Sequence, residues 1–321
     1  ALKQRFDARE IGQEWFAQNI PNDALKHALR GALAAFSNVT LMPKDQVIAI
    51  SDRDDHLQIT TQASRVSARL LIAADGHRSA CRDMLKLPIS ESAPRETALV
   101  FNTDHRGDHG GISYEFHGPL GLSIAGMKAE TAQVTTIPLP GHRSAINVVG
   151  GADAMTALAS LSGDELSAAV TKVTRDKLGT ITQAEAPKAY PIRPFRARRL
   201  AASRAVLIGE AAHALPPIGA QGLNTTLADI GVLIDLMGDA EHDDPGRGDV
   251  TRQYNRLRQA DIIARSNATG LLSDMVHRGN PVVDHLRRVG LQAIGRIAPL
   301  RRQLMMRGMA PLGKVPSLMA K

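Results

Sequence analysis

The sequence contains a single cysteine and no long hydrophobic run, and each scarcity excludes a class of protein. Cys81 is the only cysteine in 321 residues, which excludes an internal disulfide framework and a cysteine metal site and fits a reducing compartment. No run of about 18 apolar residues exists, so we expect no transmembrane helix. Residues 1–20 also lack the apolar core of a signal peptide. These absences predict a cytoplasmic protein.

The composition is that of an ordinary globular chain with a basic tail. Apolar residues make up 43% of the chain, enough for a large core, and the length favours about two domains. The net charge of +7 is uneven: the segment from Val276 onward has nine Lys or Arg residues and Asp284 alone, a charge of +8, and the rest of the chain carries −1. This distribution indicates that the tail binds a partner, and it argues against nucleic-acid binding by the main part of the protein. The tail is either a terminal helix pair packed on the core or a basic amphipathic surface that contacts anionic lipid.

Residues 204–237 are the stretch around which the rest of the chain is organised. Residues 205–208 form a short apolar run that ends at Gly209, and apolar residues recur at helical spacing from Leu223 onward. The pattern predicts a strand, a long turn and a helix, in that order.

The long turn carries the residue types that suit a ligand. Pro216 and Pro217 stiffen it, whereas Gly219 and Gly222 let backbone amides come close to a ligand without an intervening Cβ. Those amides end at a helix N-terminus, where unpaired N–H groups and the helix dipole favour an anionic or electron-rich ligand. A turn of this kind also reverses the chain in many proteins without binding anything, so the pattern by itself leaves both interpretations open.

A second stretch, residues 69–82, has a similar organisation. Residues 70–73 are apolar without alternation, which predicts a strand covered on both faces. Asp75 and Gly76 follow at its carboxyl end, where open α/β sheets bind ligands. Taken alone, an Asp-Gly pair is also a common turn.

The remainder of the chain divides into elements of recognisable period. A helix from Asn22 is predicted to pack its apolar face in the core, and residues 158–178 are predicted to be mostly helical, with Ser162 as a cap before Glu165. Short runs separated by turns between residues 95 and 187 predict an antiparallel sheet. Strands are expected at residues 39–42, 46–50, 57–61, 97–102, 112–116, 122–125, 133–137 and 145–149, and a last long helix at residues 252–272.

Two motifs in these stretches resemble those of a known family. GEAAHALPPIGAQGLN, which begins at Gly209, resembles the second flavin-binding motif of the class A aromatic hydroxylases, GDAAHxxxPxxGxGxN. ADGHRSACR, which begins at Ala74, resembles their ADGxxSxxR motif. With REIGQEWFAQNIPNDAL near the start and RRQLMMRGM near the end, nearly the whole chain resembles the ubiquinone-biosynthesis hydroxylases, flavin monooxygenases of polyprenylated phenols.

The resemblance implies an α/β (α+β) fold with a particular domain order. It implies a p-hydroxybenzoate-hydroxylase-like FAD-binding domain of Rossmann type that is split in sequence, an inserted antiparallel β-sheet substrate domain and a helical C-terminus. The FAD-binding domain is expected at residues 1–94 and 188–250, the substrate domain at residues 95–187 and the helical region at residues 251–321.

The resemblance also implies where FAD and NAD(P)H are held. The implied cofactor-binding residues are Asp75, Gly76, Ser79, Arg82, Gly209, Glu210, Pro217, Gly219, Ala220, Gln221, Gly222, Leu223 and Asn224, and Pro216 and Pro217 are expected to line the catalytic face. No acid, base or metal ligand is assigned. His213 is expected to be structural, because oxygen transfer requires no histidine base. The arginines of residues 193–204 are interpreted as a solvated face or, alternatively, as a landing site for cofactor phosphates.

The implied activity is the hydroxylation of a polyprenylated phenol in ubiquinone biosynthesis, with NAD(P)H, O2 and a C4a-hydroperoxyflavin. A second interpretation is hydroxylation of another aromatic substrate, because no motif in the sequence identifies the residues of the substrate pocket. A third is a non-catalytic family member whose basic tail binds lipid or a partner of a ubiquinone-synthesis complex. Such a tail would place the protein peripherally on the inner face of the membrane.

Three departures from the family pattern bear on these expectations. Glu210 replaces the usual Asp but keeps a carboxylate for a flavin ribitol hydroxyl, and the β-branched Thr226 is expected to crowd the backbone beside the flavin. No GxGxxG occurs, although the family opens with a strand, that glycine loop and a helix. The usual site for the AMP half of FAD is therefore missing. One expectation is therefore an N-terminally shortened hydroxylase, which would expose apolar strand edges and be poorly soluble.

Overall fold

The chain forms two compact units, each assembled from separate stretches of sequence. The computed structural model describes residues 4–91, 96–119, 131–174, 177–216, 221–238, 244–277, 290, 294–309 and 315–320. Unit 1 comprises Ala1–Thr40, Pro94–Ile192 and Asp274–Ala298, and unit 2 comprises Leu41–Ala93, Arg193–Ser273 and Pro299–Lys321. Both motif stretches, residues 69–82 and 204–237, belong to unit 2.

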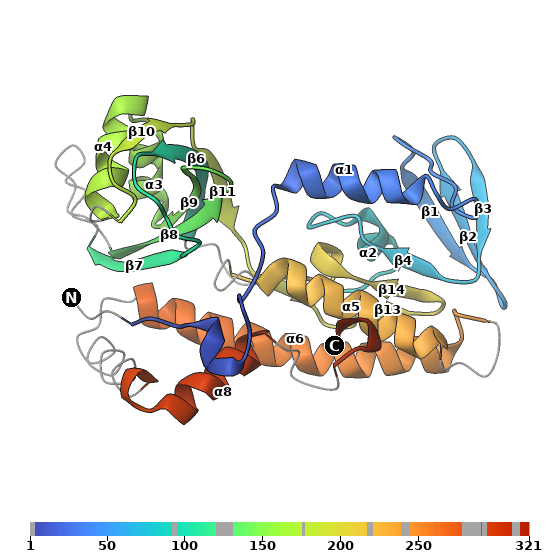
Figure 1. Ribbon diagram of the computed structural model, residues 1–321. Coiled ribbons are helices and arrows are strands. Elements are labelled where there is room, and N and C mark those ends of the chain that lie inside the picture. The colour runs from blue at the N-terminus through green and yellow to red at the C-terminus, as the bar shows by residue number, and fades with distance from the viewer. Residues whose placement is uncertain are drawn as a thin grey trace. The chain divides into compact units, whose positions relative to one another are not determined.

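Unit 1 is built on an antiparallel sheet in the order β10–β6–β9–β8–β7, with β11 also paired to β6 (Figure 1). Successive side chains point to opposite faces, so that Leu99 and Phe101 are buried while Val100 between them is exposed. The predicted antiparallel sheet is confirmed; the strand expected at residues 122–125 lies outside the described residues. The strands are β6 (Glu96–His105), β7 (Tyr114–Pro119), β8 (Thr131–Leu139), β9 (Arg143–Gly150), β10 (Ile181–Ala184) and β11 (Lys188–Ile192).

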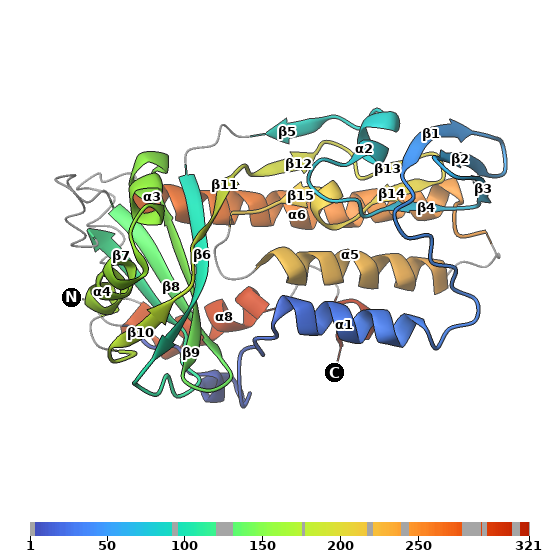
Figure 2. The same cartoon turned by 90° about the horizontal axis from the view of Figure 1, so that it is seen from above.

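Helices α3 (Ala152–Ala159) and α4 (Gly163–Val173) join this sheet in one apolar cluster, in which Leu158 and Leu166 pack with Ile146 (Figure 2). The expectation that residues 158–178 are mostly helical is confirmed for the described residues, and the two helices are separated at Ser162, which has an extended backbone. Its hydroxyl accepts the Glu165 N–H, and the Glu165 carboxylate accepts the Ser162 N–H at 2.9 Å. The predicted cap is therefore confirmed.

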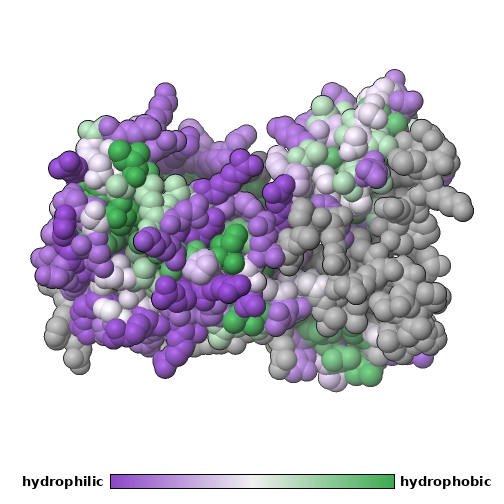
Figure 3. Space-filling view, turned by 180° about the vertical axis from the view of Figure 1, so that it is seen from behind, coloured by the Kyte–Doolittle hydropathy of each residue, from purple (hydrophilic) through white to green (hydrophobic). Residues whose placement is uncertain are grey.

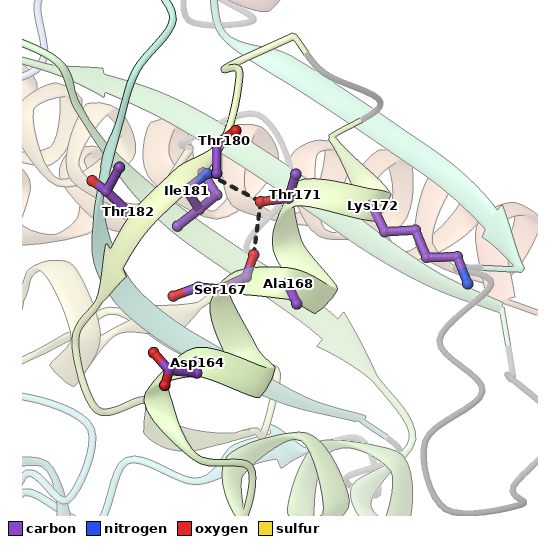
Figure 4. A pocket seen from close by; sticks show the side chains of 8 residues that line it. All are labelled: Asp164, Ser167, Ala168, Thr171, Lys172, Thr180, Ile181 and Thr182. Carbon is purple, nitrogen blue, oxygen red and sulfur yellow. Dashed lines mark hydrogen bonds between the residues drawn. The ribbon is translucent and has the colours of Figure 1, made fainter.

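A shallow hollow lies between α4 and β10 (Figure 4). Thr171 is at its centre, where its hydroxyl donates to the Ser167 carbonyl at 2.8 Å and accepts the Ile181 N–H at 3.0 Å. These polar groups are already paired with one another, and none of the motif residues lines the hollow. It therefore gives no support for a functional site.

Unit 1 also contains η1 (Ala8–Ile11) and α1 (Asn22–Leu33). Helix α1 begins where the sequence predicts, but no residue of it is buried, and Leu29 is 58% exposed. The expectation that its apolar face packs in the core is therefore wrong. A helical period shows which face is suited to burial, whereas burial itself requires a partner. The strand expected at residues 39–42 is likewise not formed, and Leu41 is exposed.

Unit 2 contains the parallel pair β4 (Leu71–Ala73) and β14 (Ala205–Leu207), with β13 (Ala201–Ala202) antiparallel to β14. Helices α5 (Gln221–Gly238) and α6 (Gly248–His277) pack on this sheet through Leu233 and Tyr254, and the Tyr254 hydroxyl donates to the Leu207 carbonyl at 2.8 Å. The antiparallel strands β1 (Val47–Asp52), β2 (Leu57–Thr61) and β3 (Arg65–Ala68) share a second apolar cluster with β14. The smaller elements are α2 (Ala80–Met84), β5 (Ile89–Glu91), β12 (Phe195–Ala197), η2 (Gly209–Ala211), β15 (His213–Ala214), α8 (Ala298–Met309) and η3 (Ser317–Met319).

The outer edge of β4 has no neighbouring strand among the described residues. The Leu71 N–H and the Ala73 carbonyl both bond toward β14, so the backbone of Ile72 faces the opposite edge. The Ile72 side chain is 42% exposed. The prediction that this strand is covered on both faces is therefore wrong, because an unbroken apolar run shows a preference for burial and not the presence of covering elements.

Residues 315–320, the last described part of the tail, pack on α5 in unit 2. Pro316 lies against Gly231, and the Ser317 N–H donates to the Asp235 carboxylate at 3.0 Å. Residues 278–289 and 291–293 of the predicted amphipathic segment lie outside the described residues. Among the helices that are described, none has the length and apolar character needed to cross a membrane. On the face drawn in Figure 3, hydrophilic side chains predominate, with smaller apolar clusters between them.

Candidate functional site

The turn that follows β14 brings η2 against the beginning of α5. Gly209 has a φ of +58°, and a Cβ at this position would lie 3.2 Å from the Thr226 side chain, so a glycine is required here. The Thr226 hydroxyl donates to the Gly222 carbonyl at 3.0 Å. Thr226 thus fills the space between α5 and η2, which is a packing role that sequence reasoning did not anticipate.

The first turn of α5 is open to solvent. Gly222, Leu223 and Asn224 are exposed, and a Cβ on Gly222 would meet nothing within 4 Å. The N–H groups of a helix start have no partner within the helix itself, and the backbone at Gly222 and Leu223 is open to a ligand at this point. Glu210 on the adjacent η2 is also exposed, and among the described residues its carboxylate makes no hydrogen bond or ion pair.

The loop after β4 is held together by the Asp75 carboxylate. It accepts hydrogen bonds from the Ser79 hydroxyl at 2.5 Å and from the Cys81 N–H at 3.0 Å. Burial disfavours the charged form, but these hydrogen bonds outweigh it and hold the pKa of Asp75 below its ordinary value. Ser79 in turn caps α2, and Gly76 turns the chain with a φ of +84°.

Arg82 connects the two motif stretches within unit 2. Its guanidinium donates to the His77 carbonyl at 3.2 Å and to the Ala211 carbonyl at 3.1 Å, and it lies 5.1 Å from the centre of the Phe195 ring. The side chain is only 7% exposed. The structure therefore gives Arg82 a bridging role, and its implied contact with a cofactor stays a prediction.

A buried charged cluster lies behind η2 and α5. Asp229 accepts hydrogen bonds from the Gly209 N–H at 3.0 Å, from His213 Nε2 at 2.8 Å and from Arg258 Nε at 2.7 Å. His213 is thus engaged in an internal pair, in keeping with the structural role expected for it. Sequence patterns did not indicate Asp229 or Arg258 as site residues. The available signal was an acidic residue inside an otherwise apolar helical stretch, because such a charge is stable only with a buried partner.

The remaining predicted residues are only partly described. Pro216 is buried at the end of β15, whereas Pro217, Gly219 and Ala220 lie outside the described residues. Of the arginines in residues 193–204, Arg204 forms an ion pair with Asp244 at 2.8 Å. Arg193, Arg198 and Arg199 are exposed, and no ion pair is found for them within the described part of the chain.

The parallel strand, glycine turn and helix, with an antiparallel unit inserted between the two motif stretches, define the fold of an FAD-dependent hydroxylase. The sequence matches the family described as FAD binding domain over residues 11–259. The chain therefore belongs to the FAD binding domain family.

Relatives and solved structures agree with this family. Ubiquinone hydroxylase UbiL of Rhodospirillum rubrum is 27% identical over 296 residues, which cover 91% of this chain and 66% of that protein. The 3-demethoxyubiquinol 3-hydroxylase of Escherichia coli is 25% identical, over 93% of this chain and 74% of that protein. The structure of OxyS anhydrotetracycline hydroxylase from Streptomyces rimosus matches with a TM-score of 0.65 at 19% identity, covering 90% of this chain and 56% of that one. The chain thus spans about two thirds of the length of the curated relatives.

FAD is the cofactor of this family, and the residues around the start of α5 fit its flavin end. The open backbone at Gly222 offers N–H donors to an electron-rich ring, and the exposed Glu210 carboxylate offers an acceptor for a hydroxyl of the ribityl chain. For the adenosine end of FAD, this sequence contains no GxGxxG loop of the kind that binds the pyrophosphate. The fit therefore concerns the flavin end of the cofactor.

Proposed function

We propose that this chain carries the flavin-holding part of an FAD-dependent monooxygenase that hydroxylates a polyprenylated phenol in ubiquinone biosynthesis, with NAD(P)H as reductant. The observation that carries the proposal is the open first turn of α5 beside the exposed Glu210. Family membership supports FAD, and the names of the two ubiquinone-pathway relatives support the substrate class. When bound, the flavin supplies the redox chemistry that inserts one oxygen atom of O2 into an aromatic ring.

In this proposal the chain contributes binding and orientation rather than an acid, a base or a nucleophile. The backbone N–H groups of Gly222, Leu223 and Asn224 would hold the electron-rich side of the flavin ring. The Glu210 carboxylate would accept a hydrogen bond from a hydroxyl of the ribityl chain. The assignment of Pro216 and Pro217 to the face toward the substrate stays a prediction from the resemblance, because Pro216 is buried and Pro217 lies outside the described residues.

The test is turnover with two matched phenols. The protein is incubated with FAD, NAD(P)H and O2 and either a polyprenylated phenol or the same phenol without its prenyl chain, and the products are analysed by mass spectrometry. The proposal expects the mass of one added oxygen on the prenylated phenol. Oxidation of the simple phenol alone would point to another aromatic substrate. If neither phenol is oxidised although FAD is bound, the result would favour the non-catalytic interpretation.

We also propose that the basic tail contacts anionic lipid, which would place the protein at a membrane surface. The exposed Arg296 and Arg302 support this, because basic residues near a negatively charged leaflet each favour association by about 1 kcal/mol. Replacing both by glutamate should weaken sedimentation with vesicles containing phosphatidylserine at low salt. Replacing the exposed Arg53, which follows β1, and the exposed Arg65 of β3 by glutamate is the matched control. Equal loss in both variants would show an effect of net charge rather than of the tail.

A further inference from the structure

A continuous chain of buried and partly buried hydrogen bonds links α6 to the turn at Gly209 and to the start of α5. Four alternating charged side chains form it: Asp229 on α5, and Arg258, Asp261 and Arg265 on α6; they are called the buried charge chain. At one end, Asp229 accepts the Gly209 N–H at 3.0 Å. At the other end, Arg265 donates to the side chain of Gln221, the first residue of α5.

The links inside the buried charge chain are short and directional. Arg258 donates from Nε to Asp229 at 2.7 Å and from Nη1 to Asp261 at 2.6 Å, and Arg265 Nε donates to Asp261 at 3.1 Å. Two cations balance two anions. Asp229 is 0% and Arg258 2% exposed, so each charge depends on its protein partners rather than on water.

The buried charge chain forms hydrogen bonds with the start of α5 at two points. Besides the Arg265 bond to Gln221, the Arg258 guanidinium donates to the Thr225 carbonyl at 3.3 Å. The N–H groups of a first helical turn have no partner within the helix, so the helix itself holds this turn only weakly. The side chains of Arg258 and Arg265 restrain this turn from α6. Asp229, at the other end of the buried charge chain, restrains Gly209 through its N–H group.

We propose that the buried charge chain is a positioning device that fixes the first turn of α5 relative to Gly209 and Glu210. The two segments then keep one spacing, as required to hold a rigid ring and its ribityl chain together. Its members touch no ligand and act through Gln221, Thr225 and Gly209. The identity of that ligand, the flavin end of FAD, rests on the proposed function, whereas the positioning is a property of the free protein.

The experiment replaces Arg265, the outermost member, by methionine. The matched control is Arg204→Met, because Arg204 also forms a hydrogen-bonded ion pair in unit 2, with Asp244, and its side chain is 13% exposed against 11% for Arg265. Amide hydrogen exchange of the free proteins is compared at residues 225–228, whose N–H groups bond to carbonyls of the first turn of α5. FAD affinity is then measured by quenching of flavin fluorescence.

Arg265→Met is expected to speed exchange at residues 225–228 by about tenfold or more, because one charged hydrogen bond at the helix start is lost. Residues 230–236 of α5 should be unaffected, and Arg204→Met should leave both regions unchanged. Unchanged exchange at residues 225–228, or equal acceleration in the Arg204→Met control, would overturn the inference.

The flavin titration separates this inference from the proposed function. Arg265→Met is expected to bind FAD about tenfold more weakly than Arg204→Met at comparable melting temperature. If the unaltered protein binds no FAD, the proposed function fails, and the exchange data alone still decide whether the buried charge chain positions α5. If FAD binds equally to both variants, the positioning device does not serve this ligand and the inference is overturned.

Discussion

Replacing Arg258 by methionine should destabilise unit 2 strongly. Methionine has a comparable length without a charge, so the change leaves the carboxylates of Asp229 and Asp261, 0% and 7% exposed, without their shared cation. Burial lowers the pKa of the Arg258 guanidinium, but the charges and hydrogen bonds of the two carboxylates raise it above its ordinary value, as expected of a strongly held pair. Removing one partner of a buried ion pair costs about 3–5 kcal/mol.

Urea unfolding followed by circular dichroism measures this cost. The Arg258→Met variant should unfold at a lower urea concentration than the unaltered protein, with a similar slope of the free energy of unfolding against urea.

The double variant Asp229→Leu, Arg258→Met removes one charge of each sign and leaves Asp261 paired with Arg265. It should be less destabilised than the sum of the two single variants, with a coupling of about 1–3 kcal/mol. Additive costs, or a loss in Arg258→Met below about 1 kcal/mol, would refute the reasoning that these side chains form one interdependent set.

Two further predictions concern the loop after β4. Ser79→Ala should cost about 1 kcal/mol at pH 7, since it removes the cap of α2 and one hydrogen bond to Asp75. The pKa of Asp75 lies below its ordinary value of 3.8, so the hydrogen bonds to its ionised carboxylate stabilise the fold at neutral pH, and this stabilisation is lost as the pH falls through the lower folded value. The free energies of unfolding of Ser79→Ala and the unaltered protein should therefore differ less at pH 3 than at pH 7. Burial, with the charge of Asp75, raises the pKa of the Cys81 thiol to about 11. At pH 8, iodoacetamide should modify the folded protein about 100-fold more slowly than the urea-unfolded protein, and equal rates would contradict a buried thiol.

Local patterns predicted the elements of the chain well, because period and turn chemistry are properties of short stretches. The antiparallel sheet of unit 1 followed from short runs between turns, and the Ser162 cap followed from the Glu165 three residues later. The strand, turn and helix at residues 204–237 were also recognisable, because glycines mark the ends of its segments.

Burial and long-range pairing could not be predicted in the same way. The apolar faces of α1 and β4 indicated burial, yet Leu29 and Ile72 are exposed, because coverage depends on segments far away in the sequence. The Arg82 bond to Ala211 joins residues 129 positions apart, and the Asp229 bond to Arg258 joins two helices. Only the folded structure brings such partners together.

FAD binding by two glycine variants of α5 tests the central claim most directly. Gly222 and Gly238 lie at opposite ends of the helix, and a Cβ on either would meet nothing within 4 Å, so valine at each should be tolerated by the fold at a similar cost. The measurement is a titration of flavin fluorescence with the unaltered protein and both variants. We predict saturable binding that Gly222→Val weakens at least about tenfold and Gly238→Val leaves unchanged. No binding by the unaltered protein, or equal binding by all three, would contradict the placement of the flavin at the first turn of α5.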